Sequence, residues 1–121
     1  MSKERYGTLF YTSPEIVLGY PHNTMTDIWS FGVLIYYLLS GEFPFNDITQ
    51  NKNTIGHKIV KSEVEFPSFK WEYRSKEVKE LIRQCLEKDM DKRPSAGEIL
   101  DAEWFTKYQF NLVKKAYSSQ R

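Results

Sequence analysis

The residues of this sequence that could do chemistry on their own are few and lie far apart. His22 and His57 are isolated, and no group of cysteine, histidine and carboxylate residues has the spacing of a zinc site. We therefore expect both histidines on the surface or in loops. Cys85 lies on an apolar helical stripe, so we expect its thiol to pack in the core rather than to react. The sequence also lacks both common glycine-rich phosphate loops, G-x-G-x-x-G and G-x-x-x-x-G-K-[ST].

The acidic residues Asp89 and Asp91 resemble the start of a calcium-binding loop. An EF-hand loop needs glycine at its sixth position and glutamate at its twelfth. This stretch offers Pro94 and Leu100 there. The calcium interpretation fails, and the sequence predicts no metal site.

Composition limits the chain to one domain and narrows its partners. It has 121 residues, of which 40% are hydrophobic, 16% aromatic and 27% charged, with formal net charge +1. So many aromatic residues argue against disorder, and a near-neutral charge argues against a nucleic-acid partner. A single cysteine forms no internal disulfide, so we expect a reducing intracellular compartment, the cytoplasm by default.

Any other function must come from residues that the fold brings together from different segments. The most prominent feature of the sequence for that fold is a long apolar run. Between Ile28 and Leu39 only Ser30 and Gly32 are not apolar. The run is too short to span a bilayer, and no signal peptide precedes it, so we expect no membrane partner. A helix that is apolar on all sides is enclosed on all sides. We therefore expect a helix over 25–40 as the central rod of the fold.

Capping signals mark the ends of the expected helices. Thr24-Met25-Thr26-Asp27 has the form of a capping box, and Gly41 is a usual stop residue. Other helices are expected over 14–18, over 51–61, over 76–86 behind a Ser75 cap, and after a second capping box at Ser95–Glu98, with an extended aromatic loop over 64–71 and a turn over 89–94. The fold class is mostly α, with four or five helices around one rod.

Three segments carry the most specific pattern in the chain. The first is Gly-Thr-Leu-Phe-Tyr-Thr-Ser-Pro-Glu over 7–15, and the second is Asp-Ile-Trp-Ser-Phe-Gly-Val over 27–33 with Ser-Gly and Phe-Pro-Phe after it. The third is Lys-Asp-Met-Asp-Lys-Arg-Pro-Ser over 88–95, followed by Trp104-Phe105. In this order and spacing they resemble the later part of a eukaryotic protein kinase domain.

The resemblance covers residues 1–106 and begins inside the activation segment. It implies a partial kinase-like fold: a helical C-lobe from the activation segment to the last helix, without the N-lobe, followed by a basic tail over 107–121. The first segment looks like the serine/threonine version, with Ser13 where alanine is commoner. Other details look most like the calcium-dependent and calmodulin-dependent kinases. The implied activity is transfer of the ATP γ-phosphate to protein serine or threonine.

The resemblance also assigns a substrate-side loop. It implies that Gly7, Thr8, Leu9, Phe10 and Tyr11 receive the substrate residue that follows the phosphorylated one. Thr8 would hydrogen-bond the catalytic aspartate and its partner lysine; the less favoured alternative is a threonine in a capping turn. Phosphoryl transfer gains most from such orientation.

Four further residues are assigned supporting roles by the resemblance. Glu15 and Arg93 match a long-range ion pair that ties the activation segment to the end of the lobe. Asp27 matches an aspartate that accepts backbone hydrogen bonds from the catalytic loop, although it could instead complete a capping box with Thr24. Trp29 would support the internal spines of the kinase.

The catalytic motifs of the family are absent from this sequence. The glycine-rich loop, the strand lysine, the His-Arg-Asp loop and the Asp-Phe-Gly metal site all precede this region in the family's order. We therefore expect no ATP or Mg²⁺ site in this chain, although the complete domain uses both, and no activity from the chain alone. Met1 stands at an internal position of the activation segment, so we expect a partial kinase. Alone, such a chain would expose apolar surface and be poorly soluble or molten.

Two partner surfaces and one different function stay open at this level. The resemblance matches the helix over 51–61 to one that many kinases use for docking. The segment 107–121 interleaves Lys107, Lys114, Lys115 and Arg121 with Phe110, Val113 and Tyr117; a solvated basic tail is favoured, and a calmodulin-binding or autoinhibitory segment is the alternative. The alternative function is a non-catalytic interaction module that keeps the kinase surface without the chemistry.

Overall fold

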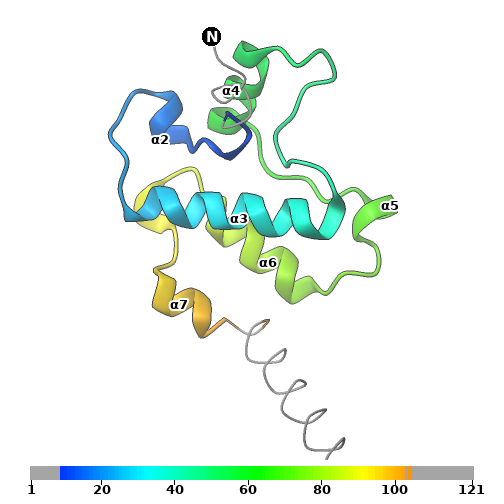
Figure 1. Ribbon diagram of the computed structural model, residues 1–121. Coiled ribbons are helices and arrows are strands. Elements are labelled where there is room, and N and C mark those ends of the chain that lie inside the picture. The colour runs from blue at the N-terminus through cyan, green and yellow to red at the C-terminus, as the bar shows by residue number, and fades with distance from the viewer. Residues whose placement is uncertain (1–8, 103, 105–121) are drawn as a thin grey trace, which may run out of the picture.

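Every regular element in the described part of the chain is helical. The computed structural model describes residues 9–102 and residue 104. Within them it has the 3₁₀ turns η1 (Leu9–Tyr11) and η2 (Met90–Lys92) and the helices α2 (Pro14–Val17), α3 (Thr24–Ser40), α4 (Lys52–Lys61), α5 (Ser68–Trp71), α6 (Lys76–Cys85) and α7 (Ala96–Leu100). Figure 1 shows α3 running across the middle of the molecule. The mostly α class is confirmed, with six α-helices in the described residues rather than four or five.

The long helix α3 begins one residue earlier than the sequence predicted. Its cap is Asn23, whose side-chain oxygen accepts hydrogen bonds from the backbone N–H groups of Met25 and Thr26. Thr26 Oγ1 accepts in return from the Asn23 N–H, which closes a capping box. The predicted box between Thr24 and Asp27 is therefore wrong, because asparagine supplies the acceptor instead. The predicted stop at Gly41 is confirmed, with a left-handed φ of 76°.

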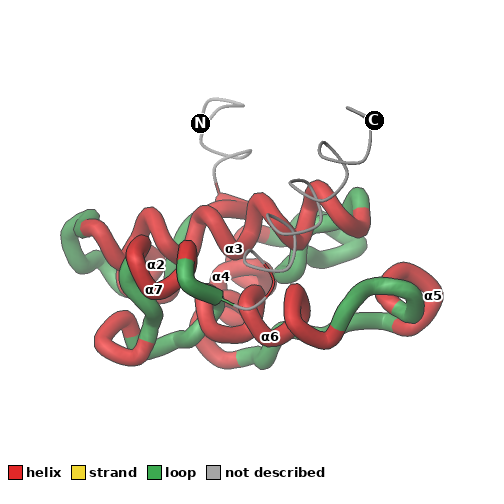
Figure 2. Tube along the Cα trace, turned by 90° about the horizontal axis from the view of Figure 1, so that it is seen from below, coloured by secondary structure: helices red, strands yellow, loops and turns green. Residues whose placement is uncertain are grey.

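The core lies where α3 packs against α6. Trp29 and Val33 on α3, and Ile82 and Cys85 on α6, are fully enclosed. Figure 2 shows the two helices alongside each other, with α5 at the end away from α2 and α7. At the crossing stands Gly32, where an added Cβ would lie 2.7 Å from Cys85 Cβ, so the helices meet backbone to backbone.

One face of α3 is open within the described residues. Leu34, Tyr37 and Leu38 are exposed by 41%, 39% and 70%. The prediction that this helix is enclosed on all sides is therefore wrong for the described residues. An uncovered stripe is consistent with further kinase elements packing there, which stays a prediction. Among the described residues, none of the helices combines the length and the hydropathy that a membrane span requires.

The aromatic segment over 64–71 is only half extended. It runs in extended form to Pro67 and then makes the single turn α5, which buries Trp71 to 1% exposure. Trp71 lies against Tyr36 and Phe66, with ring centroids 4.8 and 4.9 Å away. The expected loop is wrong over Ser68–Trp71, because proline can directly precede the first turn of a helix and the buried rings hold that turn.

The remaining caps follow the sequence signals. Ser75 accepts a hydrogen bond from the Val78 N–H at 3.2 Å, and α6 buries the predicted apolar stripe. Ser95 and Glu98 form the predicted capping box of α7. Asp89 caps η2 by accepting from the Asp91 N–H. These caps fix the turn that carries Arg93.

Candidate functional site

Glu15 and Arg93, 78 residues apart, lie in direct contact. Arg93 Nη1 donates to Glu15 Oε2 at 2.6 Å, and Nη2 donates to Oε1 at 2.7 Å. The side chain of Glu15 is 7% exposed and that of Arg93 is 0% exposed. Two parallel charge-assisted bonds of this kind fix both distance and orientation. The contact joins α2 to the residue that follows η2.

The rest of the Arg93 guanidinium is also fully engaged. Nη1 donates to the carbonyl of Met25 at 2.9 Å, Nε donates to that of Glu87 at 2.8 Å, and Nη2 reaches that of Lys88 at 3.4 Å. All five N–H donors of the side chain therefore have acceptors. The guanidinium carbon also lies 5.1 Å from the centre of the Trp29 ring. Arg93 thus connects α2, the start of α3 and the end of α6.

The charge of Glu15 is stabilised by its surroundings. Burial by itself would raise the pKa of the carboxyl group, but the hydrogen bonds and charge of Arg93 and the Thr26 hydroxyl outweigh it. The pKa lies below its ordinary value of 4.5. The stability that the pair contributes is therefore complete above pH 4.5 and is lost as the pH falls through the lowered pKa.

A second cation, Lys88, lies against the ring of Trp29. This lysine was assigned no role from the sequence. Lys88 Nζ is 5.2 Å from the Trp29 ring centre and 4.1 Å from that of Phe45, and it donates to the carbonyl of Ile59 at 2.7 Å. Burial lowers the pKa of Lys88 to about 8. Trp29 stacks on Phe45, with ring centres 5.7 Å apart. Lys88 lies beside both rings, and Arg93 lies beside that of Trp29. Lys88 ties the end of α4 to this cluster.

The predicted substrate loop is described only in part. Gly7 and Thr8 lie outside the described residues, and Leu9, Phe10 and Tyr11 form η1. Phe10 stacks on Phe43 with ring centres 4.5 Å apart, and Tyr11 meets the same ring edge-on at 5.3 Å. The turn is therefore held against the loop that follows α3.

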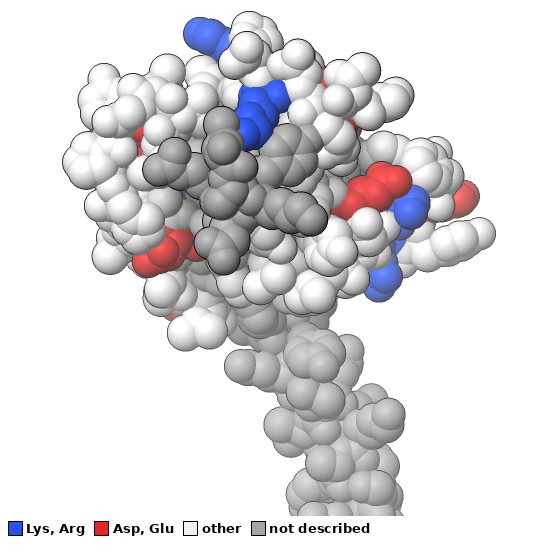
Figure 3. All heavy atoms as spheres, turned by 45° about the horizontal axis from the view of Figure 1, so that its top comes forward, with Lys and Arg blue, Asp and Glu red and all other residues white. Residues whose placement is uncertain are grey.

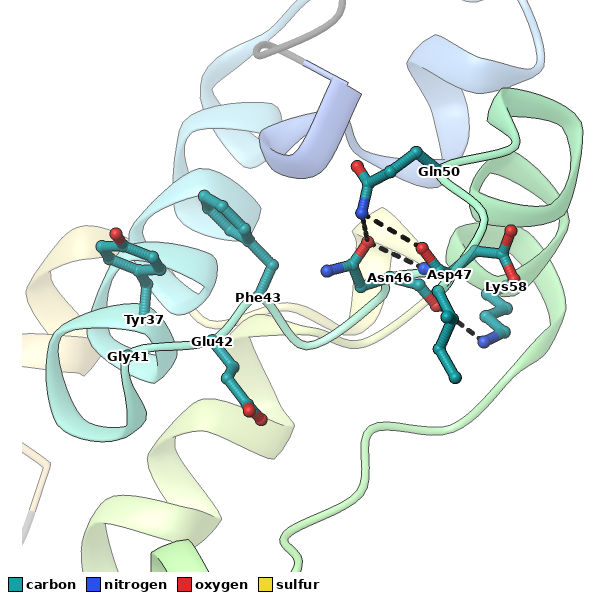
Figure 4. A pocket seen from close by; sticks show the side chains of 9 residues that line it. Tyr37, Gly41, Glu42, Phe43, Asn46, Asp47, Gln50 and Lys58 are labelled. Atoms are coloured by element: carbon teal, nitrogen blue, oxygen red, sulfur yellow. Dashed lines mark hydrogen bonds between the residues drawn. The ribbon is translucent and has the colours of Figure 1, made fainter.

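A pocket of about 450 Å³ opens beside this aromatic contact (Figure 4). Tyr37 and Phe43 form one side, and their rings stack at 4.6 Å. The loop on the other side is held by Lys58 Nζ, which donates to the Asn46 carbonyl at 2.6 Å, and by Gln50. The pocket is thus a fixed depression next to η1.

Asp27 has an exposed position in the described structure. Its side chain is 69% exposed, and its Oδ1 lies 3.1 Å from His22 Nε2. The interpretation that it completes a capping box with Thr24 is wrong, because Asn23 and Thr26 form that box. The carboxylate faces outward from the start of α3, where an incoming segment could reach it.

Ser13, the departure from the commoner alanine, is fully buried. Its Oγ has no hydrogen-bond partner among the described residues. A buried hydroxyl without a partner costs free energy, about 1–3 kcal/mol in mutational series. Alanine would therefore suit this position at least as well.

Comparisons with known proteins agree with this geometry. The family model described as "Protein kinase domain" matches residues 2–105. This chain belongs to the protein kinase domain family. The kinase region of twitchin from C. elegans has a similar structure, with a TM-score of 0.75 and 30% sequence identity over 82% of this chain and 17% of that one. The kinase-like fold of the described helices is thereby confirmed.

Two curated relatives place this kinase chain near the calcium-dependent group. Calcium-dependent protein kinase 5 of Plasmodium falciparum is 38% identical over 109 residues, which are 90% of this chain and 19% of that protein. Calcium-dependent protein kinase 21 of Arabidopsis thaliana is 38% identical over 98 residues, or 81% of this chain and 18% of that protein. The resemblance to serine/threonine kinases is confirmed. The chain spans less than a fifth of the length of these two relatives.

The protein kinase family uses ATP and Mg²⁺, and the described residues were searched for a group that could hold such a metal ion. No three or more His, Cys, Asp and Glu side chains gather into a metal-binding group in the described residues. Asp27, the predicted support of the catalytic loop, lies against His22 in the described structure. What the arrangement can do is hold the turn η1 in a fixed place against the loop that follows α3.

Proposed function

We propose that this chain is the C-terminal portion of a serine/threonine protein kinase that transfers the ATP γ-phosphate to protein serine or threonine. The chain supplies the substrate-side turn and the helical support, whereas the ATP site, the Mg²⁺ ions and the catalytic loop belong to elements outside it. The observation that carries this proposal is the buried double contact of Arg93 with Glu15, at 2.6 and 2.7 Å. It fixes α2, and with it η1, to the far end of the lobe.

The position of η1 supports a role in orienting the substrate. Phe10 and Tyr11 are held on Phe43, so the turn has a fixed relation to the α3 rod. Gly7 and Thr8 immediately precede it, and we assign Thr8 to hydrogen-bonding the catalytic aspartate. Phosphoryl transfer depends mainly on such positioning and on charge stabilisation.

In this proposal, Asp27 and Trp29 support the catalytic loop of the complete domain. The outward-facing carboxylate of Asp27, 69% exposed, is free of the capping box and accepts backbone N–H groups of the catalytic loop when the complete domain is assembled. Trp29, enclosed at 0% exposure between the cations of Arg93 and Lys88, gives that region a rigid base.

A hybrid kinase tests this function. In it, residues 1–106 replace the corresponding segment of the kinase domain of Plasmodium falciparum calcium-dependent protein kinase 5. We expect the hybrid to phosphorylate a mixed peptide library on serine and threonine and not on tyrosine, as read by phosphoamino-acid analysis. A hybrid that also carries Lys92→Ala, an exposed position on η2, serves as the matched control and should be equally active.

The hybrid distinguishes the proposed kinase function from that of a non-catalytic interaction module. Cooperative melting and binding of Mg–ATP show that the hybrid is folded. A folded hybrid that transfers no phosphate would contradict the proposed function and favour a non-catalytic module.

A further inference from the structure

Met90 on η2 makes an unusual contact with the cap of α3. The side-chain Nδ2 of Asn23 donates a hydrogen bond to Met90 Sδ at 3.3 Å, across 67 residues of sequence. A thioether sulfur is only a weak acceptor. The same side chain carries the oxygen that accepts from the N–H groups of Met25 and Thr26. Figure 1 shows the yellow turn η2 beside the start of α3. Met90 therefore contacts the residue that caps the first turn of α3.

Asn23 is connected in turn to the buried ion pair. Its backbone N–H donates to Thr26 Oγ1 at 3.1 Å, and the Thr26 hydroxyl donates to Glu15 Oε2, also at 3.1 Å. Arg93 Nη1 donates both to that carboxylate oxygen and to the Met25 carbonyl. A displacement of Asn23 therefore reaches the pair that fixes α2 by two routes, the Thr26 hydroxyl and the Met25 carbonyl.

Met90 lies on a turn whose neighbouring residues face solvent. Met90 and Met25 are the methionines of the described residues, and both are half-buried. Met25 packs against the hydrophobic core, whereas Met90 stands between the exposed residues Asp89 and Asp91. The charged side chains drawn in Figure 3 lie in small separate patches of either sign, and an uncharged oxidant such as hydrogen peroxide does not depend on them to approach. Because susceptibility to oxidation follows exposure, Met90 is the more susceptible of the two.

We propose that Met90 is a modification site whose sulfur is oxidised by hydrogen peroxide to the sulfoxide. A sulfur lone pair attacks one oxygen of the peroxide, so that the S–O bond forms and the O–O bond breaks. The hydroxide that leaves takes the proton of the transferred oxygen, and the products are the sulfoxide and water. The sulfur loses two electrons, which reduce the peroxide. Methionine sulfoxide reductases reverse the change with electrons from a thiol.

The sulfoxide cannot keep the contact with Asn23. An oxygen has no room between two atoms 3.3 Å apart, and the polar group replaces a flexible apolar side chain. The amide of Asn23 must turn toward the new oxygen or toward water, which takes its own oxygen away from the N–H groups that it caps. The effect on activity rests on the proposed function: oxidation loosens the tether of α2 and slows phosphoryl transfer.

Peptide mass spectrometry of the hybrid kinase after treatment with hydrogen peroxide tests the modification. We expect the sulfoxide to form about five-fold faster at Met90 than at Met25, and at equal rates once urea has unfolded the hybrid, because only the fold distinguishes the two. The melting temperature of the treated hybrid should fall by roughly 2–4 °C, the shift that loss of one helix cap causes in a domain of this size. Neither measurement depends on phosphoryl transfer.

Three variants of the hybrid connect the sulfoxide with its effect. In the parent hybrid, peroxide should lower kcat/KM at least about two-fold, and a methionine sulfoxide reductase with dithiothreitol should restore it. Met90→Leu keeps an apolar side chain that peroxide cannot oxidise, so peroxide should change neither its activity nor its melting temperature. Met25→Leu, the matched control, should stay as sensitive as the parent. Met90→Gln places a polar group at the site without oxidation and should melt as early as the oxidised parent.

Specific results would overturn the inference. These are equal rates of oxidation at Met90 and Met25 in the folded hybrid, or equal sensitivity of Met90→Leu and the parent to peroxide. A hybrid that keeps its activity and melting temperature after complete conversion of Met90 to the sulfoxide also refutes the inference and leaves the kinase function standing. A hybrid that transfers no phosphate, yet forms the sulfoxide first at Met90 and then melts earlier, refutes the kinase function and leaves the modification site standing.

Discussion

Replacing Arg93 by alanine in the hybrid kinase is expected to lower the free energy of unfolding by about 3–5 kcal/mol. The substitution leaves the Glu15 carboxylate buried with its main partner gone, and it also frees the carbonyls of Met25 and Glu87. An uncompensated buried charge costs far more than the net contribution of the intact pair. Urea denaturation followed by tryptophan fluorescence measures the change, and phosphoryl transfer should fall with it.

The neighbouring residue provides the control for Arg93. Lys92 is exposed on η2, so Lys92→Ala should change the free energy of unfolding by no more than about 0.5 kcal/mol. Arg93→Lys should rescue only part of the loss, since an ammonium group cannot make two parallel bonds to one carboxylate. Equal urea midpoints for Arg93→Ala and Lys92→Ala would contradict the role assigned to the pair.

Replacing Gly32 by alanine should destabilise the hybrid by about 1–3 kcal/mol. The new Cβ would lie 2.7 Å from Cys85 Cβ and 3.1 Å from Leu86 Cδ2, so α3 and α6 must move apart. The backbone-attached Cβ of Cys85 cannot rotate away as the end of a long side chain would. Thermal melting measures the effect, and it should exceed the gain in helix propensity that alanine brings.

Gly56→Ala is the matched control for Gly32→Ala. Gly56 also lies inside a helix, but its added Cβ has an ordinary contact of 3.5 Å with Val17. This variant should be more stable than the parent hybrid by up to about 1 kcal/mol. Melting temperatures that move in the same direction for the two variants would show that α3 and α6 do not meet as closely as described.

Local signals in the sequence predicted most of the helices. The cap at Ser75, the box at Ser95–Glu98 and the stop at Gly41 act through neighbouring backbone groups, so they can be recognised without the fold. The apolar spacing of α6 likewise reports directly which side of the helix is buried.

The sequence predictions were wrong where packing between distant residues, or the choice between two possible caps, decides the structure. Asn23 and Thr24 are both acceptable caps, and only the structure shows that Asn23 is used. The turn Ser68–Trp71 depends on Trp71 reaching Tyr36, which lies far away in the sequence. The open face of α3 at Leu34 and Leu38 could not be read from apolar residues alone, since hydrophobicity does not say whether a partner is present.

The site was predictable only through resemblance. No periodicity links Glu15 with Arg93 across 78 residues, whereas the three kinase-like segments do. Lys88 belongs to the third kinase-like segment but was given no role of its own, because a lysine just beyond a helix is usually solvated and its burial against Phe45 depends on the tertiary fold. A lysine two residues after Leu86, the last apolar residue of the stripe that α6 begins, is the signal that was available.

The central claim is that this chain completes a kinase whose catalytic motifs precede it in the same polypeptide. Sequencing the transcripts that contain the Met1 codon tests it most directly. The predicted result is an open reading frame that continues upstream and encodes His-Arg-Asp and then Asp-Phe-Gly. An in-frame stop codon shortly upstream of Met1 in every transcript, with neither motif encoded, would contradict the claim.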